Sequence, residues 1–126
     1  QRMTPNEYQN LAMRTNDGEA NYRLRKAQVD NIEYDVGGIF NACLGLSGEV
    51  GEFNDMIKKW VFHEKELDVG HLKKECGDIL WYVAMMCQSF NWNMEEIMQM
   101  NIDKLKSRYP EGFDTYLANH REKQDV

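Results

Sequence analysis

The sequence predicts an all-α protein, folded as an antiparallel bundle of the four-helix type. Apolar residues in the middle of the chain recur at alternating steps of four and three, which places them on one face of a helix. Helix-start motifs stand before the periodic segments, and no alternating apolar–polar run of useful length competes with them. Because short connections join the last three predicted helices, each should run antiparallel to its neighbour.

The first predicted helix begins at a capping motif. Thr4 can cap the helix, Pro5 suits its first turn, and Glu7 completes a capping box. An Asn-Asp-Gly turn signal then predicts that this helix ends near Thr15.

The next stretch, residues 16–37, is polar and ambiguous. Residues 20–29 are compatible with another helix. A Gly-Gly pair, Gly37 and Gly38, is expected to separate this stretch from the helix after it.

Three further helices are predicted after the glycine pair. The first covers residues 39 to about 63, and Asp68 is the expected cap of the next, which runs to about residue 90 and is apolar on nearly all sides over residues 79–87. The last begins at a capping box at Asn93 and ends at Pro110. The side chains expected on buried faces are Ile39, Cys43, Leu46, Val50, Phe53, Ile57 and Trp60 in the first of these helices, and Met98, Ile102, Leu105 and Tyr109 in the last.

Length and composition restrict the class of protein. A chain of 126 residues predicts one domain, residues 1–126. The net charge of −6 argues against binding long nucleic acid. No signal peptide is expected at the start of the sequence, and no membrane helix is expected because no run reaches about 18 apolar residues. Cys43, Cys76 and Cys87 fall within apolar helical patterns, which favours reduced core thiols in a cytoplasmic protein.

Two pairs of acidic residues stand where the bundle should have its core. Glu49 and Glu52 are three residues apart and share one helix face, at the edge of the apolar stripe. Glu75 and Asp78 repeat this spacing directly before the most apolar segment. Buried carboxylates at close range repel one another and lose hydration, and a divalent cation removes both costs. Oxygen ligands with no histidine in the motif favour Mg²⁺ over zinc.

The same acids are also compatible with exposed helix positions, paired with lysines such as Lys58 and Lys74. Three glycines beside the acids, Gly48, Gly51 and Gly77, help to decide between an exposed helix face and a functional site. A glycine in a helix interior lowers the stability of the helix by about 1 kcal/mol relative to alanine. Glycines beside the acids favour a functional site, although close helix packing would explain them as well.

A cationic stripe on the last helix is a candidate phosphate site. Asn101, Lys104 and Arg108 are spaced by three and four, so they share one face. Arginine offers phosphate oxygens a two-pronged contact and lysine a point charge. Lys59 shares the face of Glu52, and Tyr82 shares that of the second acidic pair. The cationic stripe is also compatible with an ordinary solvated helix face, where basic residues near the C-terminus favour the helix dipole. Tyr82 is also compatible with an ordinary core position.

The histidines form no site by sequence. His63 and His71 flank the loop between the second and third helices, and His120 lies in a polar tail, so each is interpreted as a surface residue. A di-metal redox bundle would need Glu-x-x-His pairs, which the sequence lacks.

Three motifs succeed one another in a characteristic order: Gly-Glu-Val-Gly-Glu at 48–52, Glu-Cys-Gly-Asp-Ile-Leu-Trp-Tyr at 75–82, and the segment 101–110, which closes on Arg-Tyr-Pro. Together they resemble the MazG family of all-α nucleoside triphosphate pyrophosphohydrolases, which also includes the dimeric dUTPases and a histidine-biosynthesis pyrophosphohydrolase. The resemblance spans about residues 39–113 and leaves 114–126 as a polar tail. The family's first motif often has two adjacent glutamates, and here Gly48 takes the first place.

The resemblance implies conversion of a (d)NTP and water to the (d)NMP and pyrophosphate, as in nucleotide-pool housekeeping. It implies assembly as a homodimer or, as a dimer of dimers, a homotetramer. One carboxylate can orient or deprotonate the water, and Glu49 and Glu52 are the candidates. By position, Glu49, Glu52, Glu75 and Asp78 match the ligands of Mg²⁺, for which Mn²⁺ is a possible substitute. The implied substrate contacts are Asn41 and Tyr82 near the nucleoside and Lys59, Asn101, Lys104 and Arg108 at the phosphates.

The alternative function is a non-catalytic nucleotide sensor or regulatory helical bundle, because a nucleotide-binding pocket needs most of the same residues. No motif in the sequence indicates which base or which sugar of the nucleotide the protein prefers. Tyr22, Arg23, Arg25 and Lys26 would either close over the nucleotide or form an ordinary exposed segment.

Overall fold

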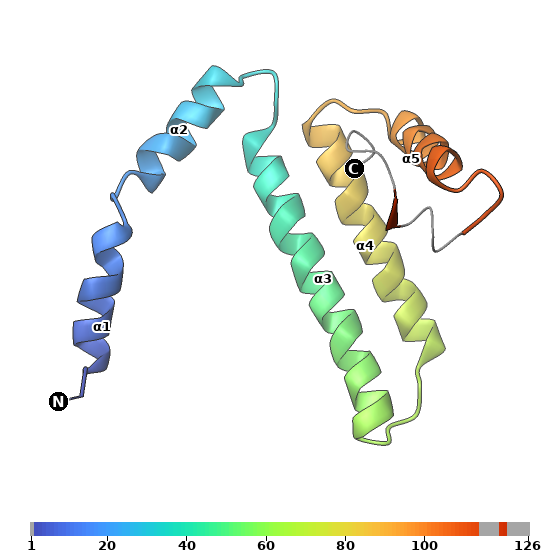
Figure 1. The fold of residues 1–126 in the computed structure, drawn as a ribbon, viewed down its shortest axis with the longest axis horizontal. Coiled ribbons are helices and arrows are strands. Elements are labelled where there is room, and N and C mark those ends of the chain that lie inside the picture. The colour runs from blue at the N-terminus through green and yellow to red at the C-terminus, as the bar shows by residue number, and fades with distance from the viewer. Residues whose placement is uncertain (1, 114–118, 121–126) are drawn as a thin grey trace. The chain divides into compact units, whose positions relative to one another are not determined.

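The computed structural model describes residues 2–113, 119 and 120, and Figure 1 shows a helical chain. Its elements are α1 (Pro5–Ala12), the 3₁₀-helix η1 (Met13–Thr15), α2 (Ala20–Asp30), α3 (Val36–Phe62), α4 (Val69–Ser89) and α5 (Met94–Arg108). Over the described range, the β-type pairing is an isolated bridge between Pro110 and Gly112, so the predicted all-α class is confirmed. None of these helices has both the length and the apolar character to cross a membrane. Most of the predicted tail, residues 114–126, lies outside the described residues.

The described residues up to Val36 form one compact unit, and those from Gly37 onward form another. The predicted capping box is present in the first. The backbone N–H of Glu7 donates to Oγ1 of Thr4 at 3.1 Å, and the N–H of Thr4 donates to the Glu7 carboxylate, also at 3.1 Å. The ambiguous polar stretch contains a helix, α2, preceded by Asp17, which pairs with Arg23. The hydrogen bond from Arg23 lowers the pKa of the Asp17 carboxyl.

The helix α3 begins earlier than the sequence predicted. It starts at Val36 and includes Gly37 and Gly38, so the pair lies inside the helix and not before it, although the boundary between the two compact units does fall directly before Gly37. Gly38 is buried, and its packing outweighs the low helix propensity of glycine, about 1 kcal/mol per residue. The helix has 27 residues and is therefore about 40 Å long. It ends at Phe62, close to the predicted boundary.

The helices α3 and α4 run antiparallel and are joined by the loop 63–68 (Figure 1). Two contacts fix their register. Nδ2 of Asn41 lies 3.7 Å from Sδ of Met85, and one turn further along α3 the ring of Tyr82 lies against Gly45. Each turn forward along α3 therefore corresponds to one turn back along α4.

The contact with Tyr82 requires a glycine at position 45. A Cβ atom there would lie 2.1 Å from Cε1 of Tyr82. Gly45→Ala should lower the free energy of unfolding by about 1–3 kcal/mol, as overpacking does, despite the better helix propensity of alanine. Gly48→Ala is the matched control, because a Cβ there has nothing within 4 Å, and it should stabilise the metal-free protein by up to about 1 kcal/mol. Equal effects of the two substitutions in urea denaturation would contradict this role of Gly45.

The corner between α4 and α5 is tightly formed. Asn91 adopts a left-handed backbone conformation, with φ of 62°, and the rings of Phe90 and Trp92 stack with centroids 4.3 Å apart. Asn93 caps α5 as predicted, accepting a hydrogen bond from the backbone N–H of Glu96 at 3.3 Å. The helix ends at Arg108, two residues before the predicted boundary.

A single chain has a very small core. Among the described residues, the buried apolar side chains are Ala42 and Cys87. Cys43 and Cys76 are exposed, so the prediction of core thiols was correct for Cys87 and wrong for the other two. Helical spacing places Cys43 on the apolar face of α3, but α4 covers only part of that face.

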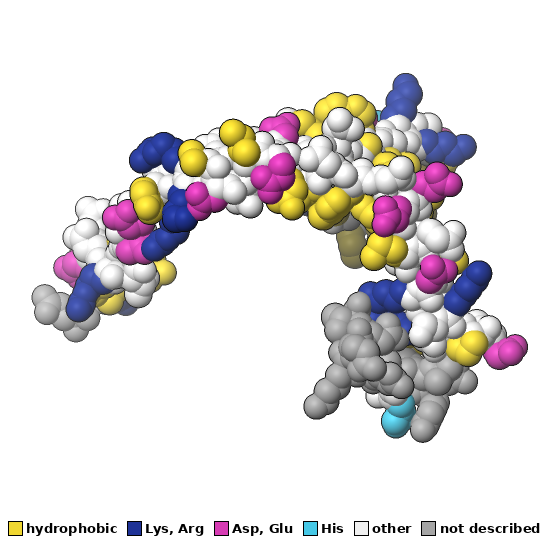
Figure 2. Space-filling model, turned by 90° about the horizontal axis from the view of Figure 1, so that it is seen from above, with side chains coloured by type: hydrophobic (Ala, Val, Ile, Leu, Met, Phe, Trp, Pro, Cys, Tyr) yellow, Lys and Arg dark blue, Asp and Glu magenta, His cyan; other side chains and the backbone are white. Residues whose placement is uncertain are grey.

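Large apolar side chains of α4 and α5 lie at the surface instead. Leu80 and Trp81 on α4 are 57% and 58% exposed. Met98, Ile102 and Leu105, predicted on the buried side of α5, are exposed as well. Figure 2 shows apolar side chains, in yellow, on the surface of the molecule. These faces have the periodicity of packed helices, and their predicted burial fails because no helix in the described part of one chain covers them.

Candidate metal centre

Three of the four predicted acidic ligands meet between α3 and α4. Glu49, Glu52 and Glu75 each offer a carboxylate oxygen, and these oxygens all lie within 4.8 Å of one another. Glu49 and Glu52 are one turn apart on α3, and the antiparallel register sets Glu75 opposite them. The helix pair therefore builds a cluster of negative charge that a divalent cation would neutralise.

Two oxygens of this cluster are buried without a partner. Glu75 is only 8% exposed and Glu49 is half-buried. Oε2 of each has no hydrogen-bond partner in the described part of the chain. A carboxylate oxygen in this state is destabilising, and an oxygen-binding cation would satisfy both atoms. The donor set fits a hard divalent cation such as Mg²⁺ or Mn²⁺.

The carboxylates of this cluster do not all ionise at neutral pH without a cation. A hydrogen bond with Glu75, desolvation, and the charges of Glu52, Glu75 and Asp78 raise the pKa of Glu49 to about 7. The pKa of Glu75 is lowered, first by its hydrogen bond with Glu49 and then by those with Glu52 and His71. Without a cation, the neighbouring acids therefore favour the protonated form of Glu49, and a bound cation would favour its ionised form.

Asp78, the fourth predicted ligand, lies at the edge of the cluster. It is exposed, one turn beyond Glu75 on α4, and its charge helps to raise the pKa of Glu49. It is not among the three acids whose oxygens meet within 4.8 Å. Its role as a ligand stays a prediction.

A groove of about 490 Å³ opens beside the cluster. Lys59, a predicted phosphate contact, lines it, and the Nζ atom lies 2.6 Å from Oδ2 of Asp55. This contact lowers the pKa of the Asp55 carboxyl. The described residues that line the groove come from α3 and α4: Gly48, Gly51, Glu52, Asp55, Met56, Lys59, His71 and Glu75. One hollow thus holds both the acids and an ammonium group.

The glycines beside the acids are not in close contact with a neighbouring helix in the described part of one chain. A Cβ atom at Gly48, Gly51 or Gly77 would have nothing within 4 Å. Close approach of α3 and α4 therefore does not explain them. Gly48 and Gly51 line the groove, where their small size keeps space free beside Glu52.

His71 is exposed, as predicted, but it lies at this site, which the sequence analysis did not expect of any histidine. Its Nε2 atom lies 3.1 Å from Oε1 of Glu75, and the residue lines the groove. The sequence did carry a signal, because His71 precedes Glu75 by four residues and therefore shares its helix face. The signal was missed because His71 lies outside the acidic motif, close to the helix end. His63 and His120 are exposed, as predicted.

The two predicted nucleoside contacts lie on the other side of the acids from Lys59 along the helix pair. Asn41 is exposed, near the start of α3. Tyr82 is half-buried, with its ring against Gly45 and edge-on to the ring of Trp81, at a centroid distance of 5.0 Å. Both residues are therefore within the helix pair that carries the acids, but they do not line the groove.

The predicted phosphate stripe lies on α5. Asn101 is exposed there, while Lys104 and Arg108 are half-buried. None of the three is among the described residues that line the groove. A single chain does not bring this stripe to the acids in any described contact.

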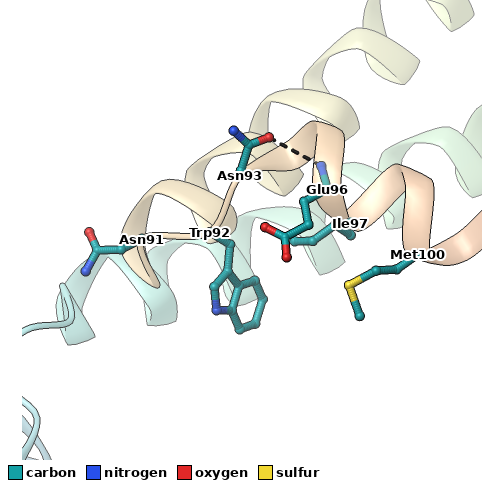
Figure 3. Close-up of a pocket in the computed structure, with 6 residues that line it drawn as sticks. All are labelled: Asn91, Trp92, Asn93, Glu96, Ile97 and Met100. Carbon is teal, nitrogen blue, oxygen red and sulfur yellow. Dashed lines mark hydrogen bonds between the residues drawn. The ribbon is translucent and has the colours of Figure 1, made fainter.

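A second hollow, of about 540 Å³, lies at the corner between α4 and α5 (Figure 3). Figure 3 shows the indole of Trp92 and the side chain of Met100 on the same side, with the Glu96 carboxylate between them. The described lining residues are Asn91, Trp92, Asn93, Glu96, Ile97 and Met100. Because Glu96 is the one ionisable group among them, they offer no set of metal ligands.

The fold and the site define an all-α protein with a carboxylate cluster able to hold a metal ion between two antiparallel helices. Residues 41–113, more than half of the chain, match the MazG nucleotide pyrophosphohydrolase domain. The protein therefore belongs to the MazG nucleotide pyrophosphohydrolase family, which confirms the resemblance seen in its motifs. It is also similar to the gene 37 protein of Mycobacterium phage L5, with 32% identity over 88 residues, 66% of this chain and 73% of that protein. No solved structure matches the chain.

Proposed function

We propose that this protein is a Mg²⁺-dependent nucleotide pyrophosphohydrolase that converts a (d)NTP and water to the (d)NMP and pyrophosphate, in nucleotide-pool housekeeping. The meeting of Glu49, Glu52 and Glu75, in a chain of this family, carries the proposal. The two buried, unpartnered oxygens support a cation at this point. Lys59 in the adjoining groove supports an anionic substrate. The free cysteines support action in a reducing cytoplasm.

Four carboxylates would hold the cation: Glu49, Glu52, Glu75 and Asp78. Oxygen donors of this kind suit Mg²⁺, and Mn²⁺ can take its place. When bound, the cation would neutralise charge on the phosphate oxygens.

Hydrolysis of a phosphoric anhydride needs no protein nucleophile. Water attacks phosphorus, its proton passes to a base, and pyrophosphate leaves. We assign the base to Glu49 or Glu52; Glu52 is exposed and lines the groove, so water reaches it. Lys59, paired with Asp55, is the cation that would face the phosphates.

Residues outside the groove would complete the substrate site. Asn41 and Tyr82 would contact the nucleoside, and Asn101, Lys104 and Arg108 the phosphates. Because the stripe on α5 does not line the groove of its own chain, we propose that it serves the site of a second subunit in a homodimer or dimer of dimers. The uncovered apolar faces of α4 and α5 support such assembly. A solution mass of one chain, 14.9 kDa, in light scattering would contradict it.

Pyrophosphate release from a panel of canonical and modified nucleoside triphosphates tests the catalytic proposal. Equal amounts of pyrophosphate and monophosphate are expected with Mg²⁺, and neither with EDTA. Release of orthophosphate would contradict the proposed bond cleavage. Nucleotide binding without turnover in Mg²⁺ would instead indicate the non-catalytic sensor. The same panel ranks base and sugar preference.

A further inference from the structure

The carboxylate of Glu75 is held at one oxygen and open at the other. Oε1 lies 3.1 Å from Nε2 of His71, while Oε2 is buried and has no hydrogen-bond partner in the described structure. Oxygens of Glu49 and Glu52 lie within 4.8 Å of a Glu75 oxygen. The two oxygens of Glu75 thus differ in their surroundings, which fixes the orientation of the carboxylate.

The backbone of His71 is itself held in place. Its N–H donates to Oδ1 of Asp68 at 3.0 Å, in the cap of α4. Glu75 follows His71 by four positions on the same helix, which puts the imidazole over that carboxylate. A continuous set of bonds therefore runs from the cap of α4, through His71, to the most buried acid of the cluster.

We propose that His71 is a positioning residue for the cation centre: its imidazole N–H holds Oε1 of Glu75 and presents Oε2 to the cation. The inference rests on the proposed function for its catalytic consequence, but its effect on cation binding stands apart from turnover. Hard cations such as Mg²⁺ and Mn²⁺ prefer oxygen, so the imidazole acts on the ligand and not on the metal. Hydrogen bonds of this kind to a liganding group typically alter metal affinity by about 10–100-fold.

Binding of Mn²⁺ to the full chain without nucleotide, measured from the free Mn²⁺ signal in electron paramagnetic resonance, tests this role. His71→Ala should raise the Kd for Mn²⁺ by about 10–100-fold. His71→Gln keeps a side-chain N–H donor of similar reach and should recover part of this loss. His71→Asn, whose amide is one methylene shorter, should bind as weakly as His71→Ala. His63→Ala, which removes an exposed imidazole at the start of the loop between α3 and α4, should bind as the wild type does.

Wild-type Mn²⁺ affinity in His71→Ala, with binding lost in Glu75→Gln, would overturn the positioning role and leave the proposed function intact. Equal loss in the Ala and Gln variants would overturn it in favour of direct ligation by the imidazole. Wild-type affinity for Mn²⁺ in Glu75→Gln would show that Glu75 is not a ligand, and it would overturn the positioning role of His71 as well. Circular dichroism in EDTA should give the same helix content for every variant, because His71 is exposed at the first turns of α4. Pyrophosphate release, measured separately, decides the proposed function.

Discussion

Glu52→Gln should lower kcat for pyrophosphate release by about 100-fold to 10,000-fold, the range that a positioned acid–base group contributes. Glutamine keeps the size of the side chain but removes the charge that would hold the cation and the basicity that would accept a proton from water. Glu52 lines the groove and its oxygen meets those of Glu49 and Glu75, so the substitution acts directly at the centre. Wild-type turnover in this variant would remove Glu52 from the mechanism.

The fold should survive this substitution. Glu52 is exposed, and its charge opposes ionisation of Glu49, so its removal relieves repulsion in the metal-free protein. The helical signal in circular dichroism should therefore be unchanged. Glu66→Gln, which neutralises an exposed acid in the loop after α3, is the matched control and should retain full activity.

Asp78→Asn extends the same experiment to the edge of the cluster. Asp78 influences Glu49 through its charge but does not bring an oxygen into the group of three. A loss of turnover comparable to that of Glu52→Gln would assign Asp78 to the cation site. Activity close to that of the wild type would limit the site to Glu49, Glu52 and Glu75.

In EDTA, the free energy of unfolding should fall as the pH rises from about 4.5 to about 7, because of Glu49. The folded protein raises the pKa of Glu49 from 4.5 to about 7, so the folded state binds this proton more tightly than the unfolded state. The resulting stability is fully present below pH 4.5 and is lost as the pH passes through 7. Glu75 and Asp55 have lowered pKa values, so their contributions are lost only at lower pH and do not offset this trend.

Thermal unfolding between pH 4.5 and 8 measures this trend. Glu49→Gln should flatten it, because the titrating carboxyl is gone. Saturating Mg²⁺ should raise the Tm most at the upper end of the range, where Glu49 is ionised and the cation replaces the displaced proton. The same slope in the wild type and in Glu49→Gln would show that Glu49 does not carry the effect.

Local signals in the sequence predicted local structure well. Thr4, Asp68 and Asn93 cap helices as expected, because a cap depends only on residues within one turn. The predicted start of the helix at Ile39 was too late, because Gly37 and Gly38 are helical and burial of Gly38 outweighs its low helix propensity. The prediction of burial failed along α5, whose apolar face is exposed because periodicity identifies a face suited to packing but not the element that covers it.

The acidic pairs could also be predicted from the sequence, because a spacing of three residues sets two side chains on one helix face. Their meeting depends on the register between α3 and α4, and this is set by contacts far apart in the sequence, such as Gly45 with Tyr82. The register also brings Lys59 of α3 and His71 of α4 to the same groove.

The amino-acid sequence by itself therefore determined the helices, their caps, the acidic pairs and the family of this protein. Only the tertiary structure decided that Glu49, Glu52 and Glu75 form the close group, that Asp78 lies at its edge and that Glu75 is buried. The reason is physical. Helix periodicity is encoded within about one turn of chain, whereas desolvation and the raised pKa of Glu49 arise only when charges from two helices are brought together.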